Sequence, residues 1–88
     1  MSSWQVQPTD EALQGLAALD ADDRKAVLDW FATTLSDDPE SPGVGFRRRL
    51  GPGLSQHLAR VPGTNVLVGF LPVQQFWTVR VTTIEAFD

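Results

Sequence analysis

The stretch VLVGFL at residues 66–71 decides the fold, because it is apolar on both faces of an extended chain. Such a run is typical of a strand in the middle of a sheet. Turn sequences bound it on both sides, with PGTN at 62–65 before it and PVQQ at 72–75 after it. Proline presets φ and glycine permits positive φ in such turns. We therefore expect 66–71 to be the central strand of an antiparallel meander.

The predicted meander covers residues 54–84, with a strand at 54–61 before the centre and a strand at 76–84 after it. In the last strand apolar and polar side chains alternate, which predicts one buried and one wetter face. The buried set is Trp77, Val79 and Val81, and the wetter set is Thr78, Arg80 and Thr82.

Helical periodicity predicts a helical hairpin at about 9–36. The first helix is expected to begin after Thr9, whose side chain is a good N-cap. Gly15 is expected to weaken this helix by roughly 1 kcal/mol relative to alanine. Its predicted apolar stripe consists of Leu13, Leu16 and Ala17.

The second helix is expected to begin at Asp20, followed by acids that favour a helix N-terminus. Apolar residues then recur at helical spacing, with Arg24 and Lys25 on a solvated side near Asp29. The predicted apolar face consists of Val27, Trp30, Phe31 and Thr34, widened by Leu28 and Leu35.

Residues 4–7 (WQVQ) alternate and end at Pro8, so a short first strand is predicted, joining the sheet at an edge. Proline and glycine predict a loop at 37–53, although 46–53 could also extend the helical region. The sequence thus predicts a single α+β domain over 1–88, ordered β-α-α-β-β-β. The helical hairpin is expected to pack on one face of an antiparallel sheet.

Charge is divided between the two halves of the chain. Residues 1–40 carry nine acids against two basic residues, a balance of −7, whereas residues 41–88 have a balance of +3. The acidic total of −4 argues against a general nucleic-acid-binding domain. A basic strand half instead suggests a local surface for phosphate or an acidic partner.

Composition excludes several classes of site. The chain has no cysteine and one histidine, so neither a disulfide framework nor a His- or Cys-based metal site is expected. No cofactor is expected, since no nucleotide-binding glycine motif is present. No apolar run approaches the ~20 residues of a membrane span, and the N-terminus lacks signal-peptide features. We therefore expect a soluble cytoplasmic protein without membrane contact.

The element order, the segment LARVPGTNVLV at 58–68 and the closing strand WTVRV at 77–81 resemble the RelE/ParE superfamily of bacterial toxins. The resemblance implies inhibition of translation through ribosome-dependent mRNA cleavage, or inhibition of DNA gyrase. It also implies neutralisation by a small antitoxin that wraps the toxin.

The chain departs from the nuclease pattern of that superfamily. Asn65 and Val66 follow the turn where an arginine is typical, and no tyrosine occurs anywhere. Cleavage through a 2′-OH needs a general base, a general acid and cations. His57 is the candidate general base, since histidine alone titrates near neutrality. The set is incomplete, so nuclease activity is expected to be weak or absent.

The leading hypothesis is therefore a toxin-type domain that acts by binding an antitoxin-like or other acidic protein. Arginine offers a planar fork of donors suited to carboxylates. One alternative is a stand-alone interaction or scaffold domain, including a homodimer through an exposed sheet edge. A lesser alternative is a ribosome-dependent mRNA endonuclease. The candidate binding surface consists of Arg47, Arg48, Arg49, Arg60, Phe76 and Arg80.

Overall fold

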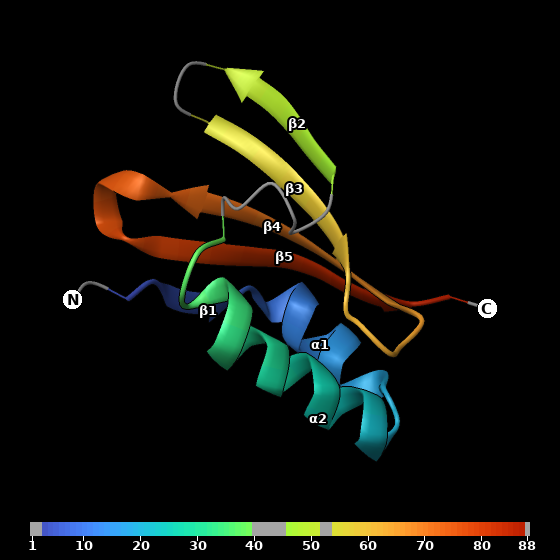
Figure 1. The fold of residues 1–88 in the computed structure, drawn as a ribbon. Helices are drawn as coiled ribbons and strands as arrows, with labels where there is room; N and C mark the ends of the chain where they lie inside the picture. Colours follow the sequence, from blue (N-terminus) through green and yellow to red (C-terminus); the bar gives the residue numbers. More distant parts are fainter. Residues whose placement is uncertain (1–2, 40–45, 52–53, 88) are drawn as a thin grey trace.

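The computed structural model describes residues 3–39, 46–51 and 54–87, with only the backbone for 46–51 and residue 54. Its helices, turns and strands follow one another along the chain (Figure 1). They are β1 (Gln5–Pro8), α1 (Asp10–Ala18), α2 (Ala21–Trp30), the π-helical turn η1 (Phe31–Leu35), β2 (Phe46–Gly51), β3 (Leu54–Arg60), β4 (Val66–Val73), the 3₁₀ turn η2 (Gln74–Phe76) and β5 (Thr78–Ala86).

The strands form one five-stranded sheet in the order β1-β5-β4-β3-β2, with both helices on the same side of it (Figure 1). This confirms the predicted α+β class, the helical hairpin on one face and the central place of 66–71. The predicted antiparallel meander and the edge position of the first strand are confirmed, but the sheet as a whole is mixed, because β1 runs parallel to β5. Strand β5 follows β1 only after both helices and three other strands. No tight hairpin therefore joins β1 to β5 and forces them to run in opposite directions.

Residues 46–51 form strand β2, neither the predicted loop nor a helical extension. The backbone of β2 pairs antiparallel with β3, Arg47 opposite His57 and Arg49 opposite Ser55. A run of three arginines has no strand periodicity of its own. The strand is therefore a consequence of pairing with β3, which local patterns do not encode.

A bulge in β5 changes which of its side chains face the helices. Gly69 of β4 pairs with Thr83, but the next residue, Phe70, pairs with Val81, so Thr82 is the extra residue. The Thr82 hydroxyl donates a hydrogen bond of 3.2 Å to the Gly69 carbonyl oxygen. As a result Ile84 is buried on the same face as Val81, three positions before it.

Helix α1 packs on the sheet through Ala12, Gly15 and Leu16. The predicted stripe is therefore right at Leu16 and wrong at Leu13 and Ala17, which are exposed. Ala12 is fully buried, whereas Leu13 is 46% exposed. A Cβ added at Gly15 would collide with the carbonyl oxygen of Ile84 in β5. Gly15 thus allows the backbones of α1 and β5 to approach closely, and its cost in helix propensity is offset by this packing.

Both helices of the hairpin begin at the predicted capping residues. Thr9 Oγ1 accepts the Ala12 amide at 3.2 Å, and the Asp20 carboxylate accepts the Asp23 amide at 2.8 Å. Arg24 does not act as a solvated charge. It donates from α2 to the last carbonyl oxygens of α1 and the link, with distances of 3.4 Å to Leu16, 3.2 Å to Ala17 and 2.8 Å to Leu19.

The core lies between the helices and one face of the sheet. Trp30 and Phe31 contribute from the helical layer as predicted, but Leu28 is exposed instead of widening the apolar face. Trp30 meets Phe70 at 6.1 Å between ring centroids in an edge-to-face contact. The strand residues buried on this face are His57, Ala59, Val66, Val68, Phe70, Pro72, Val79, Val81 and Ile84.

Candidate functional site

The face of the sheet away from the helices, here called the open face, carries Arg60 and Arg80. Arg60 ends β3 opposite Leu67 of β4, and Arg80 of β5 lies opposite Leu71. Both arginines are exposed, and side chains alternate along a strand, so their neighbours Ala59 and Val79 are buried toward the helices. The structure therefore brings two of the predicted binding residues to one face.

Arg60 and Arg80 do not form a continuous strip. They are separated by two strand spacings of ~4.8 Å and four residues of ~3.3 Å along β4, about 16 Å between Cα atoms. Leu67 pairs with Arg60 and Leu71 pairs with Arg80, so both leucines lie between the two arginines, and both are partly exposed. Neither guanidinium makes a hydrogen bond or ion pair within the described ranges. Among the described side chains, the open face thus has Leu67 and Leu71 between two separate arginines, with the exposed Glu85 opposite Leu67.

His57 is on the other face of the sheet. Its side chain is only 3% exposed and stacks on Phe70, with ring centroids 5.0 Å apart. A general base must come within hydrogen-bonding reach of its substrate. A histidine inside the core does not meet that condition, so its position gives the general-base hypothesis no support. His57 is therefore separated from Arg60 and Arg80 by the sheet itself.

The β4–β5 connection carries the third predicted contact region. Phe76 is 69% exposed, as its expected position beside a turn implied. Trp77 does not lie on the buried strand face as predicted: it is 45% exposed. It adopts a left-handed φ of 49°, which is uncommon for a bulky residue, and contacts Trp4 edge-to-face at 5.2 Å. Trp77 is the C-cap residue of η2 and precedes β5, so the alternation of the strand does not extend to its side chain.

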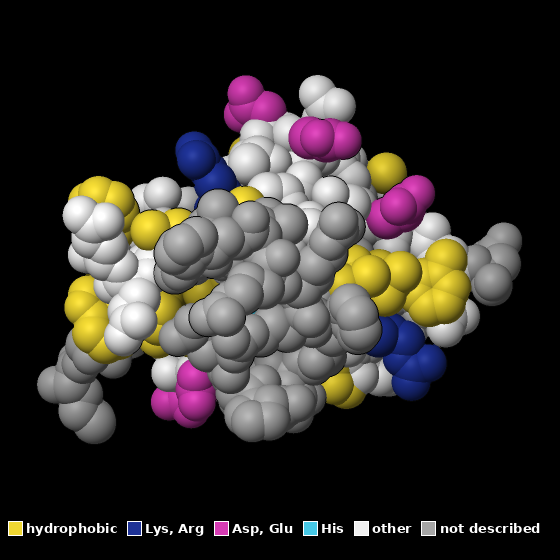
Figure 2. All heavy atoms as spheres, turned by 90° about the horizontal axis from the view of Figure 1, so that it is seen from above, with side chains coloured by type: hydrophobic (Ala, Val, Ile, Leu, Met, Phe, Trp, Pro, Cys, Tyr) yellow, Lys and Arg dark blue, Asp and Glu magenta, His cyan; other side chains and the backbone are white. Residues whose placement is uncertain are grey.

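The side chains of Arg47, Arg48 and Arg49 lie outside the described part of the structure, which places only their backbone in β2. Figure 2 views the molecule from above the sheet in Figure 1. Among the described side chains on this side, Lys and Arg appear in two separate places, with hydrophobic groups on both flanks. The described arginines therefore do not gather into one patch.

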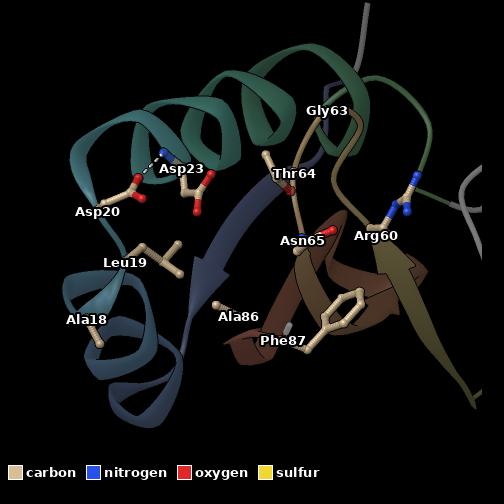
Figure 3. A pocket seen from close by; sticks show the side chains of 10 residues that line it. All are labelled: Ala18, Leu19, Asp20, Asp23, Arg60, Gly63, Thr64, Asn65, Ala86 and Phe87. Atoms are coloured by element: carbon tan, nitrogen blue, oxygen red, sulfur yellow. Dashed lines mark hydrogen bonds between the residues drawn. The ribbon is translucent and has the colours of Figure 1, made fainter.

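A groove lies at the end of the sheet next to Arg60, and no sequence pattern predicted it (Figure 3). Its volume is about 720 Å³. One wall is the link between the helices with the start of α2, and the other is the β3–β4 turn with the end of β5. Its lining residues are Ala18, Leu19, Asp20, Asp23, Arg60, Gly63, Thr64, Asn65, Ala86 and Phe87.

The two turns beside this groove were recognisable in the sequence, at 62–65 and at the capping residue Asp20. Their proximity was not recognisable, because about 40 residues of chain separate them and only the sheet pairing brings them together. Within the described residues, no group of three or more His, Cys, Asp or Glu side chains could hold a metal ion. None of the described helices is long and apolar enough to cross a membrane.

Comparison with known proteins gives matches of structure only. No family model and no curated protein matches the sequence. A chain of the archaeal RelE–RelB complex from Pyrococcus horikoshii matches with a TM-score of 0.77 and 10% identity, over 94% of this chain and 93% of that one. A chain of the RelBE2 toxin–antitoxin complex from Mycobacterium tuberculosis matches with a TM-score of 0.76 and 25% identity, over 99% and 94%.

The isolated RelE toxin of Escherichia coli is also similar, with a TM-score of 0.68 and 13% identity over 97% of this chain and 85% of that one. These likenesses extend over nearly the whole of each chain. They include the helical hairpin as well as the sheet. The chain has a RelE-like toxin fold.

Proposed function

We propose that this protein is a toxin-type domain that acts by binding through its open face and is itself bound by a small antitoxin-type protein. The observation that carries the proposal is the exposure of Arg60 and Arg80 on the open face of a RelE-like fold. Two of the similar structures are toxin–antitoxin complexes, which supports a partner of that type.

The open face has the composition of a protein-binding surface. Arg60 and Arg80 have hydrogen-bond donors that no described residue uses. Leu58 of β3, the strand between β2 and β4, is 44% exposed and lies beside the partly exposed Leu67. Protein interfaces are enriched in arginine around a desolvated apolar centre. Carboxylates of a partner would pair with the arginine forks, which makes an acidic partner the best match.

Messenger RNA cleavage is not part of this proposal. The single histidine of the chain is in the core, and the chain has no tyrosine. Arg60 and Arg80 can stabilise negative charge, but they are poor general bases because guanidinium does not lose its proton in proteins. Occupation of a macromolecular surface requires no general base, so it needs only the groups that the open face provides.

The test is induced expression in Escherichia coli of the wild-type protein and of the double variant Arg60→Ala/Arg80→Ala. Growth is followed together with the rates of protein and DNA synthesis. We expect the wild type to slow growth and the double variant to grow normally at equal protein levels. The matched control is Lys25→Ala, which removes an exposed positive charge from the helical layer and is expected to slow growth like the wild type.

The synthesis rates identify the target class. Early loss of protein synthesis indicates a ribosome-directed toxin, and early loss of DNA synthesis indicates a gyrase-directed one. Normal growth with the wild-type protein would reject toxin activity in favour of a scaffold domain. Undiminished growth arrest by the double variant would show that the toxin acts through another surface.

A further inference from the structure

The groove at the end of the sheet is bordered by an acid and a base, and in Figure 3 Asp23 is turned toward its centre whereas the guanidinium of Arg60 points outward from its rim. Asp23 projects from the first turn of α2 on one side, and Arg60 lies at the end of β3 on the other. Neither side chain makes a hydrogen bond or ion pair within the described part of the chain. Asp20, by contrast, already accepts the Asp23 backbone amide at 2.8 Å. Asp23 therefore has both carboxylate oxygens available to a ligand, whereas one oxygen of Asp20 is already engaged.

The lining of the groove is mainly polar, and its exposed apolar part is Ala86 and Phe87 at the end of β5, with the buried Leu19 beneath. Leu19 points into it from the helical link, and Ala86 and Phe87 border it from the end of β5. The Phe87 amide donates to the Asn65 carbonyl oxygen at 2.9 Å, which ties the end of β5 to the β3–β4 turn.

The β3–β4 turn is itself closed by Thr64. The Thr64 hydroxyl donates to the Val61 carbonyl oxygen at 2.8 Å and accepts the Val66 amide at 3.1 Å. A wall fixed by its own hydrogen bonds loses little conformational entropy on binding. The side-chain amide of Asn65 is exposed beside it and available for a polar contact.

These features select the class of ligand. A volume of about 720 Å³ is within the ~300–1,000 Å³ typical of ligand sites. The carboxylates of Asp20 and Asp23 would repel the phosphates of a nucleic acid. An acid, an apolar group and a base together are the side chains of a short polypeptide segment.

We infer that the groove binds an extended segment of a protein partner, with a basic side chain at Asp23, an apolar side chain over Leu19 and an acidic side chain at Arg60. This inference rests on the proposed function, because Arg60 borders both the open face and the groove. A partner chain that crosses the open face reaches Arg60 and continues into the groove around this end of the sheet.

The test uses purified ¹⁵N-labelled protein titrated with the blocked peptide acetyl-Glu-Leu-Lys-Leu-Glu-amide and followed by NMR. The central lysine is flanked by the same residues on both sides, so the peptide fits in either direction. We expect millimolar binding, with chemical-shift changes concentrated at the amides of Leu19, Asp23, Thr64 and Asn65. The same peptide with Gln in place of Glu and Lys is expected to bind more weakly.

Two matched variants make the test specific. Asp23→Asn is expected to weaken peptide binding by about three- to five-fold, as loss of a partly exposed ion pair predicts. Asp22→Asn removes the same charge from the same helical turn, outside the groove, and is expected to leave affinity unchanged. Absence of binding at 5 mM peptide, shift changes elsewhere, or equal affinity in Asp23→Asn would overturn the inference.

Failure of the groove is distinguishable from failure of the proposed function. Arg80→Ala lies outside the groove and is expected to leave peptide binding unchanged. Normal growth on expression would reject the toxin activity without changing the peptide titration. Growth arrest with no peptide binding would retain the toxin and reject the groove.

Discussion

The two faces of the same sheet differ in what covers them rather than in the kind of strand that builds them. On the helix-covered face Val68, Phe70 and Val81 are fully buried. Their direct neighbours in sequence, such as Leu67 and Arg80, are partly or fully exposed on the open face. The covered face therefore supplies the stability, and the open face is left with side chains that can bind. Substitutions on the two faces should separate these roles.

The largest effect is expected from Phe70→Ala on the covered face. Phe70 is fully buried and contacts the rings of both Trp30 and His57. Removal of its ring should cost about 3–5 kcal/mol in the free energy of unfolding. Urea unfolding measures this cost. Leu71→Ala, one position along on the open face, should cost at most ~1.5 kcal/mol, and an equal loss at both positions would contradict the distinction between the faces.

The next effect concerns Gly15→Ala, a substitution that favours a free helix. The added methyl group would collide with the Ile84 carbonyl oxygen, so α1 must move away from β5. The overpacking is expected to destabilise the protein by about 1–3 kcal/mol despite the gain in helix propensity. Gln14→Ala, exposed on the same helix, is the control and should change stability by less than ~0.5 kcal/mol. A more stable Gly15→Ala variant would show that α1 is not held against β5.

A smaller effect is expected from Arg24→Ala within the helical layer. The variant removes three hydrogen bonds to carbonyl oxygens at the end of α1 and in the link. We expect a loss of about 1–2 kcal/mol, measured by thermal unfolding as a clear fall in Tm. Lys25→Ala removes a neighbouring exposed charge and should leave Tm almost unchanged. Equal Tm values for the two variants would assign Arg24 to the solvated surface after all.

The smallest effect on stability is expected from Arg60→Ala/Arg80→Ala on the open face. Both side chains are exposed and have no hydrogen bond in the described structure. The free energy of unfolding should therefore change by less than ~0.5 kcal/mol. The effect on growth should nevertheless be large. A double variant that loses both stability and activity would place these arginines in the fold rather than in a binding surface.

Local patterns predicted the elements whose determinants are close together in sequence. Thr9 and Asp20 were identified as helix caps because a cap needs only an amide three residues later. The candidate site was predicted in part, since alternation along the last strand placed Arg80 on the other face of the sheet from the buried Val79 and Val81. Alternation did not extend through the bulge at Thr82, which exists because β4 and β5 pair out of step.

The sequence by itself determined the class of the fold, the central strand at 66–71 and the division into an acidic helical part and a basic strand part. Only the tertiary structure decided that 46–51 is a strand, that β1 joins β5 in parallel and that α1 packs through Gly15. It also decided that His57 is buried while Arg60 borders a groove with Asp23. The physical reason is that periodicity reports which side chains avoid water, whereas pairing and close approach depend on partners distant in the chain.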